Sequence, residues 1–170
     1  MTGVEVPAWN ATWYKTMPTV LLDEFQQEIL EREVRAFLTG VADPEAQARY
    51  AGLLQGVEEK EVSEEFAAAL EGILTIVLES GRARKLYGPP GENSLNSLFQ
   101  KTPRGSALVQ QANEVNKALK GLEGQTLGGV SFRSTGAGSW GLTLQTDRGE
   151  LTLRIDRQGI RVHDLEVDLG

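Results

Sequence analysis

The sequence predicts an α+β protein in which an N-terminal helical part precedes a four-stranded antiparallel β-meander. Apolar residues recur with helical spacing in the first two thirds of the chain and alternate one by one after Leu122. Glycines stand where the predicted helices end, at Gly40, Gly56, Gly81 and Gly121. Because one face of the meander is apolar, we expect a helix to cover that face.

The chain separates into three parts on these patterns. Residues 1–18 form an aromatic N-terminal arm, residues 19–121 a region of four to five helices, and residues 122–170 the meander. Within the helical region, the glycine and proline run at residues 88–91 predicts a loop or linker. The sequence leaves open whether the meander shares one core with the last helix.

The first three helices can be placed from their caps. Thr19 is the expected N-cap of a helix that runs to about Thr39. The second follows Asp43 as N-cap, with Pro44 at the first helical position, where its missing N–H group costs nothing. Ser63 is the expected cap of the third helix, which is the most apolar and should lie at the centre of the helical core.

The last helix carries the clearest start signal in the chain. After a predicted single turn at residues 94–99, Thr102 stands as N-cap and Pro103 at the first helical position, and Gly121 ends the helix.

Four strands are expected at residues 126–133, 140–146, 150–156 and 160–169. The turns before Glu150 and Ile160 read as three-residue hairpin loops, each with a left-handed glycine at Gly149 or Gly159. The alternation slips by one residue at His163 and Asp164, which predicts a bulge in the last strand.

Charge is segregated along a chain of net charge −7. Residues 19–81 hold 14 Asp/Glu and 4 Lys/Arg, whereas residues 82–120 hold 2 and 7. The basic segment is a candidate anion or nucleic-acid contact. Its candidate residues are Arg82, Arg84, Lys85, Lys101 and Arg104. The competing interpretation is that these cations lie against the acidic helices or stabilise helix C-termini.

Motifs for catalysis are weak in this sequence. Gly136–Gly141 matches a dinucleotide pattern, but it joins two predicted strands instead of a strand and a helix. His163 is the sole histidine, and the glutamates of residues 58–65 resemble a solvated helix start. We therefore expect no catalytic residue, metal site or cofactor, and the sequence leans against an enzyme without deciding the question.

The chain has no cysteine, which suits a reducing compartment, and we expect a cytoplasmic protein without a membrane association. Trp9, Trp13 and Tyr14 lie on the arm and must be buried on this chain's core or on another chain. They are the candidate protein-contact residues.

The function favoured by these observations is that of a non-enzymatic accessory or interaction protein that acts through protein–protein contacts, with a protein partner or as a homo-oligomer. The first alternative is a nucleic-acid-associated protein that uses residues 82–120. The second is a small-ligand-binding or enzymatic pocket between the sheet and the helices.

Overall fold

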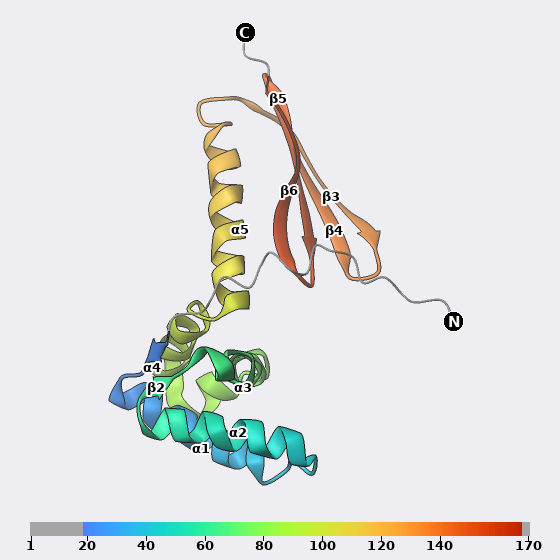
Figure 1. Ribbon diagram of the computed structural model, residues 1–170. Helices are drawn as coiled ribbons and strands as arrows, with labels where there is room; N and C mark the ends of the chain where they lie inside the picture. The colour runs from blue at the N-terminus through green and yellow to red at the C-terminus, as the bar shows by residue number, and fades with distance from the viewer. Residues whose placement is uncertain (1–18, 168–170) are drawn as a thin grey trace, which may run out of the picture. The chain divides into compact units, whose positions relative to one another are not determined.

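The computed structural model describes residues 19–167 and confirms the α+β class, with helices first and a four-stranded antiparallel sheet last (Figure 1). The chain divides into two compact units, one that ends at Gly105 and one that begins at Ser106. This division falls inside the last helix, whereas the sequence placed the start of the meander part at residue 122.

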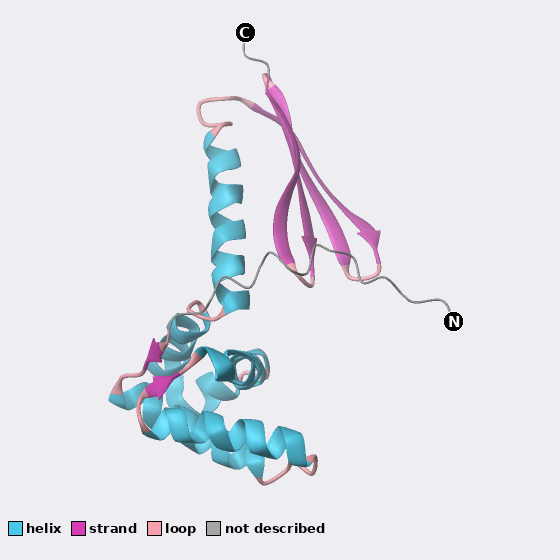
Figure 2. Cartoon of the chain, viewed as in Figure 1, coloured by secondary structure: helices cyan, strands magenta, loops and turns pink. Residues whose placement is uncertain are grey.

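The first unit contains four helices and a small two-stranded sheet. The helices are α1 (Glu24–Leu38), α2 (Pro44–Glu58), α3 (Ala67–Glu79) and α4 (Arg82–Phe99), and a 3-10 turn, η2 (Glu64–Phe66), precedes α3. The strands β1 (Val20–Leu21) and β2 (Glu61–Val62) pair antiparallel. Figure 2 shows this small sheet beside the helices.

The first helix begins four residues later than the sequence predicted. Val20 pairs with Val62 in the small sheet, so Thr19 is not the N-cap. Asp23 is the cap instead, because its side chain accepts from the backbone N–H of Gln26 at 2.8 Å. The side chain of Gln26 in turn accepts from the N–H of Asp23, which completes a capping box.

The second helix begins as predicted, with the Asp43 side chain accepting from the N–H of Ala46 and Pro44 in the first turn. The third helix starts differently, because Ser63 makes no capping hydrogen bond and the chain forms η2 first. Within the described residues, α3 contributes the largest share of the core of the first unit, as its apolar circumference predicted. Its buried core residues are Ala67, Ala69, Leu70, Ile73, Leu74 and Val77.

The loop expected at residues 88–91 is reduced to a kink at one residue. Gly88 has φ 66° and ψ −175°, and the chain is helical on both sides of it. Only glycine adopts this backbone conformation readily, so Gly88 breaks the helix. Pro89 and Pro90 then stand in the first turn after the kink, where their missing N–H groups have no helical partner to lose.

The helix α5 (Pro103–Lys120) begins as predicted. The hydroxyl of the buried Thr102 accepts from the N–H of Gly105 at 3.2 Å and donates to the carbonyl of Phe99 at 2.7 Å. The part of α5 after Gly105 belongs to the second unit together with the sheet.

The second unit is built on an antiparallel meander of four strands in the order β3-β4-β5-β6 (Figure 2). The strands are β3 (Leu127–Gly136), β4 (Ser139–Thr146), β5 (Gly149–Asp156) and β6 (Gly159–Val167). Asp164 pairs with Thr152 and Val162 with Leu153, so the chain skips His163. The predicted bulge is confirmed.

The two later hairpins differ from the prediction in loop length. Thr146 pairs with Gly149 and Asp156 with Gly159, which leaves two residues in each loop instead of three. Gly159 has φ 122°, whereas Gly149 does not adopt a positive φ. The extra ladder pair at each turn shortens the loop without changing which residues share a face.

One face of the sheet is apolar and packs against α5. Val115 and Ala118 of α5 form a core with Leu151 and Leu153 of β5. Neighbouring apolar side chains pack at its margin, namely Leu122, Leu142, Leu144, Ile160 and Val162. The last helix and the meander therefore share one hydrophobic core.

Candidate functional site

An exposed apolar surface lies on the outer strand of the sheet. We call it the β3 strip, and it consists of the side chains of Leu127, Val130 and Phe132 on β3 and Trp140 on β4. Directly opposed residues of an antiparallel pair share a face. The register pairs Val130 with Leu144 and Phe132 with Leu142, so the β3 strip continues the apolar face that packs against α5.

The helix covers this face unevenly. Leu151 and Leu153 on β5 are 0% and 2% exposed, and Leu142 and Leu144 on β4 are half-buried. On β3 the exposure rises to 58% for Val130 and 62% for Phe132. Figure 1 shows α5 alongside the sheet with β3 as an outer strand. The cover given by α5 therefore ends before β3, and an apolar surface stays open to solvent.

The two edges of the sheet differ in how they are protected. An exposed strand edge is a template for pairing with another chain, and charges and bulges normally block it. β6 carries Arg161, Asp164 and Glu166 and the bulge at His163. β3 has ten residues, no proline, and Arg133 as its sole charge. The irregularities of β3 lie near its ends, between Leu127 and Gly129 and between Ser134 and Gly136. The stretch between them is regular, so β3 is the less protected edge of this sheet.

The polar face of the sheet has an arginine-rich end. The register aligns four residues directly across the four strands, in the order Arg133, Gly141, Arg154 and Arg161. We call this line the arginine row. Asp156 offsets part of its charge, because its carboxylate accepts from Arg161 and lies 3.6 Å from the Nε atom of Arg154.

The pKa of Asp156 lies below the usual range for a carboxyl group. The backbone N–H of Gln158 donates to its Oδ1 atom at 2.8 Å and is the main cause, with Arg161 and Arg154 adding to the effect. These contacts favour the charged form of the carboxyl group. The side chain of Asp156 thus stabilises the hairpin between β5 and β6 by accepting hydrogen bonds from Gln158 and Arg161.

The opposite end of the polar face is acidic. A second line across the sheet, the acidic row, runs Gly129, Gln145, Glu150 and Glu166. The amide Nε2 of Gln145 donates to Glu150 at 2.9 Å, and its Oε1 lies 3.1 Å from the point where a Cβ on Gly129 would sit. The two rows give the sheet a cationic end and an anionic end, with β3 contributing Arg133 to one and Gly129 to the other.

Three of the five cations predicted as anion contacts form ion pairs with carboxylates. The Nε atom of Arg82 lies 2.7 Å from Glu33, that of Arg84 lies 2.7 Å from Glu92, and Arg104 lies 3.7 Å from Glu79. The remaining two, Lys85 and Lys101, are exposed. Glu33 on α1 and Glu79 on α3 belong to the acidic segment, whereas Glu92 lies on α4 itself. Two of the three ion pairs therefore favour the interpretation in which the basic segment lies against acidic helices.

Glu33 is the most buried of these carboxylates, at 5% exposed. It accepts from both Arg82 and the hydroxyl of Tyr87. Burial raises the pKa of Tyr87 to about 12, and the hydrogen bond to Glu33 adds to the shift. The guanidinium of Arg32 lies 5.8 Å from the centre of the Tyr87 ring. A buried carboxylate with two donors is a structural contact between α1 and α4.

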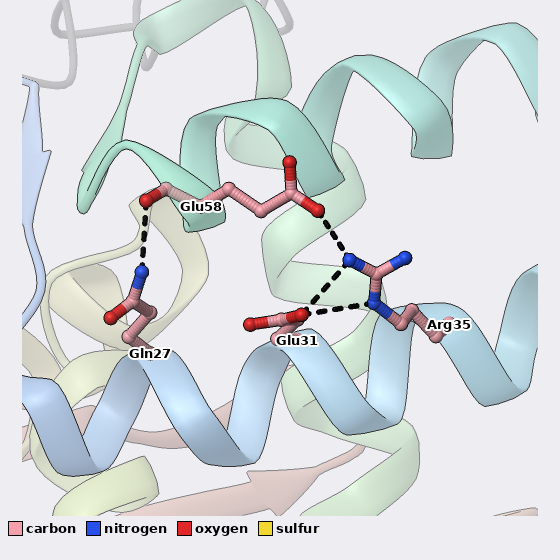
Figure 3. Close-up of polar contacts among 4 residues, drawn as sticks. All are labelled: Gln27, Glu31, Arg35 and Glu58. Atoms are coloured by element: carbon pink, nitrogen blue, oxygen red, sulfur yellow. Dashed lines mark hydrogen bonds and ion pairs between the residues drawn. The ribbon is translucent and has the colours of Figure 1, made fainter.

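Surface glutamates join α1 to α2 (Figure 3). Arg35 donates to Glu31 at 2.9 Å on its own helix and to Glu58 at the end of α2. The side chain of Gln27 donates to the backbone carbonyl of Glu58 at 2.8 Å. Glu58, one of the predicted solvated glutamates, therefore makes an exposed contact between helices.

Two open hollows occur in the second unit. One, of about 710 Å³, is lined by residues of α5 and the turn after it, including Asn116, Lys120 and Glu123. The other, of about 790 Å³, lies at the turn between β4 and β5, around Asp147 and Arg148. Neither hollow has α5 on one side and the sheet on the other, where the sequence had suggested a ligand pocket.

Within residues 19–167, no group of three or more acidic or histidine side chains is placed to hold a metal ion. The predicted contact residues Trp9, Trp13 and Tyr14 lie outside the described residues. The β3 strip was not predicted as a site, although the alternation of Val130 and Phe132 marked which face they share. The sequence does not indicate how far the covering helix extends over this face, which is why the β3 strip was not predicted.

In the part of the chain that the structure describes, no helix combines the length and apolar character that a membrane span requires. Comparison of the chain with protein-family models, with curated proteins and with solved structures finds no match.

Proposed function

We propose that this protein is an accessory or interaction protein that works through protein–protein contacts, and that the β3 strip is its contact surface. The observation that carries the proposal is the 62% exposure of Phe132 beside Val130 on the less protected edge strand of the sheet. A cluster of exposed aromatic and aliphatic side chains is typical of protein interaction sites.

The strip has the composition of a contact surface. Phe132 and Trp140 each leave on the order of 100 Å² open, because an aromatic side chain buries about 150–250 Å² when fully covered. Arg133 lies next to Phe132 in sequence and adds a cation on the opposite face of the same strand. Aromatic residues and arginine are the types enriched at interface hot spots.

The nucleic-acid alternative has less support. Arg82, Arg84 and Arg104 are in ion pairs with carboxylates, which would have to be broken or shared before a phosphate could bind. Binding that depends on phosphate contacts also requires several free cations on one surface.

Site-specific photo-cross-linking tests the proposal in the cells that make the protein. Benzoylphenylalanine replaces Phe132 in one variant and Leu165 in a matched control, which lies on the same apolar face at the other edge of the sheet. We expect a discrete intermolecular adduct from position 132, identified by mass spectrometry, and little from position 165. Equal, low yields at both positions would contradict the proposed function.

A further inference from the structure

We propose that the partner of the β3 strip is a second copy of this chain, paired edge to edge through β3 about a two-fold axis at Ser131. The inference deepens the proposed function and rests on it. This pairing would join the two sheets into one continuous antiparallel sheet with four strands from each copy. Three features support this occupant and this register. They are the alternation of apolar and polar residues along β3, the position of Arg133, and the opposite charges of the arginine row and the acidic row.

The alternation of β3 limits the registers in which two copies can pair. Directly opposed residues of an antiparallel pair share a face, so the apolar faces stay continuous only if an even-numbered residue lies opposite an even-numbered one. A pairing centred on Ser131 places Val130 of each copy opposite Phe132 of the other, so the pair occurs twice. Aromatic and β-branched side chains make favourable cross-strand pairs.

The ladder on β3 is regular over the length this register uses. Register shifts in the pairing with β4 occur between Leu127 and Gly129 and between Ser134 and Gly136. The pairs of the proposed interface run from Gly129 to Arg133 and lie between these irregularities. Ser131 at the axis is exposed and small, so it can face its own copy on the polar side of the sheet.

The position of Arg133 favours the axis at Ser131 over axes at Phe132 or Arg133. In this register Arg133 lies opposite Gly129 of the second copy, and the two arginines are separated by about 13 Å along the strand. An axis at Phe132 would bring them to a diagonal contact, and an axis at Arg133 would place them directly opposite. Like charges directly opposite destabilise a strand pair.

Charge complementarity on the polar face points to a second copy as the occupant. Because Arg133 meets Gly129, the arginine row of one copy continues into the acidic row of the other. Gly129 has no side chain, so the Arg133 guanidinium can lie across it towards Gln145 and Glu150 of the second copy. The Oε1 atom of Gln145 is placed beside Gly129, where it can accept from that guanidinium.

The chain is close to neutral where the copies would meet. Residues 106–170 hold seven Lys/Arg and eight Asp/Glu, a net charge of −1, whereas residues 1–105 carry net −6. Edge pairing through β3 buries less than the ~1,200 Å² typical of stable complexes, so we expect a dissociation constant in the micromolar range. Sedimentation equilibrium of the full chain across that range should show a monomer and dimer, and a monomer throughout would overturn the inference.

The cysteine-free sequence allows the register to be tested with single cysteines. Ser131→Cys places two thiols opposite each other at the axis, within the distance a disulfide spans. Asp164→Cys is the matched control, because it lies in the same line across the sheet but at the β6 edge. We expect Ser131→Cys to form a disulfide-linked dimer at least tenfold faster than Asp164→Cys. Equal rates, or faster linkage by Phe132→Cys, would overturn this register.

Charge reversal tests the contact between the two rows. Arg133→Glu should raise the dimer dissociation constant roughly tenfold, because two symmetric contacts between opposite charges are lost. The double variant Arg133→Glu with Glu150→Arg should recover most of that affinity. If the double variant pairs no better than the single one, Arg133 does not face the acidic row and the proposed register is wrong.

The photo-cross-linking experiment separates this inference from the proposed function. An adduct of two copies at position 132 supports both. An adduct with a different protein, or with residues 1–18 of this chain, overturns the second copy as the occupant. A different protein leaves the proposed function in place, whereas an adduct confined to the chain's own arm contradicts it.

Discussion

Glu33 and Arg82 are 49 residues apart in the sequence, and the guanidinium Nε of Arg82 donates to the Oε2 of Glu33 at 2.7 Å. Glu33 belongs to the acidic first helix and Arg82 to the basic segment that follows α3. The hydrogen bond to Glu33 raises the pKa of Arg82, with the carboxylate charge as the second cause. This contact therefore joins the acidic segment to the basic segment within the first unit.

Tyr87 gives the first unit a measurable dependence on alkaline pH. Its pKa is about 12 in the folded protein and about 10 in the unfolded chain, so the unfolded state loses its proton first as pH rises. The resulting stability is fully present below pH 10 and is lost as the pH rises to about 12. The shift corresponds to at most about 2–3 kcal/mol.

The measurement is the free energy of unfolding between pH 9 and pH 12 for the native chain and for Tyr87→Phe, with urea as denaturant. Tyr87→Phe should show a shallower loss over this interval, because the variant lacks the hydroxyl whose pKa is raised. Identical slopes would mean that the Tyr87 hydroxyl does not lie in the contact with Glu33.

Asp156 gives the second unit a dependence on acidic pH. Its lowered pKa means that its contribution to stability is present above its ordinary value of 3.8 and is lost as the pH falls through the lowered value. We expect Asp156→Asn to be less stable than the native chain by up to about 1 kcal/mol at neutral pH. The difference should shrink towards zero as the pH falls to 2, as measured by urea unfolding, and a difference that grows would contradict the assignment.

Thr102 should be the most sensitive helix cap among the described residues. Its buried hydroxyl accepts from the N–H of Gly105 and donates to Phe99, so Thr102→Ala should cost about 1–2 kcal/mol. Ser63→Ala is the control, because the Ser63 side chain makes no capping bond and its loss should cost less than about 0.5 kcal/mol. Equal effects in chemical denaturation would contradict the capping role of Thr102.

The uneven cover of the sheet by α5 can be measured on two leucines that face each other. Leu151 is fully buried beneath α5, whereas Leu165, its partner in the register, is 41% exposed. Leu151→Ala should cost about 2–5 kcal/mol because it leaves a cavity. Leu165→Ala should cost about 1 kcal/mol or less, and comparable losses in the two proteins would show that the core does not lie beneath α5.

Local signals in the sequence were sufficient for most of the elements. The caps at Asp43 and Thr102 and the bulge at His163 depend on residues a few positions apart, and all three were predicted correctly. The errors came from contacts distant in sequence. Val20 joins a strand because Val62 pairs with it, and neither residue carries that information alone.

The helical start of α4 was missed for a different reason. Residues 82–87 hold Arg82, Arg84 and Lys85 around a buried Ala83, so the stretch shows too few apolar residues for a helical pattern. The candidate site was missed because alternation tells which face Phe132 occupies but not how far a helix extends over that face. The extent of cover depends on the fit of Val115 and Ala118 against β5.

The bulge at His163 limits how far any assembly through this sheet can grow. A sheet whose two edges were equally open could add chain after chain and form a fibre. Here the β6 edge is interrupted by the bulge and carries charges, so in the proposed pairing each chain would join one neighbour, through β3. The proposed pairing would therefore end at a dimer instead of continuing into a polymer.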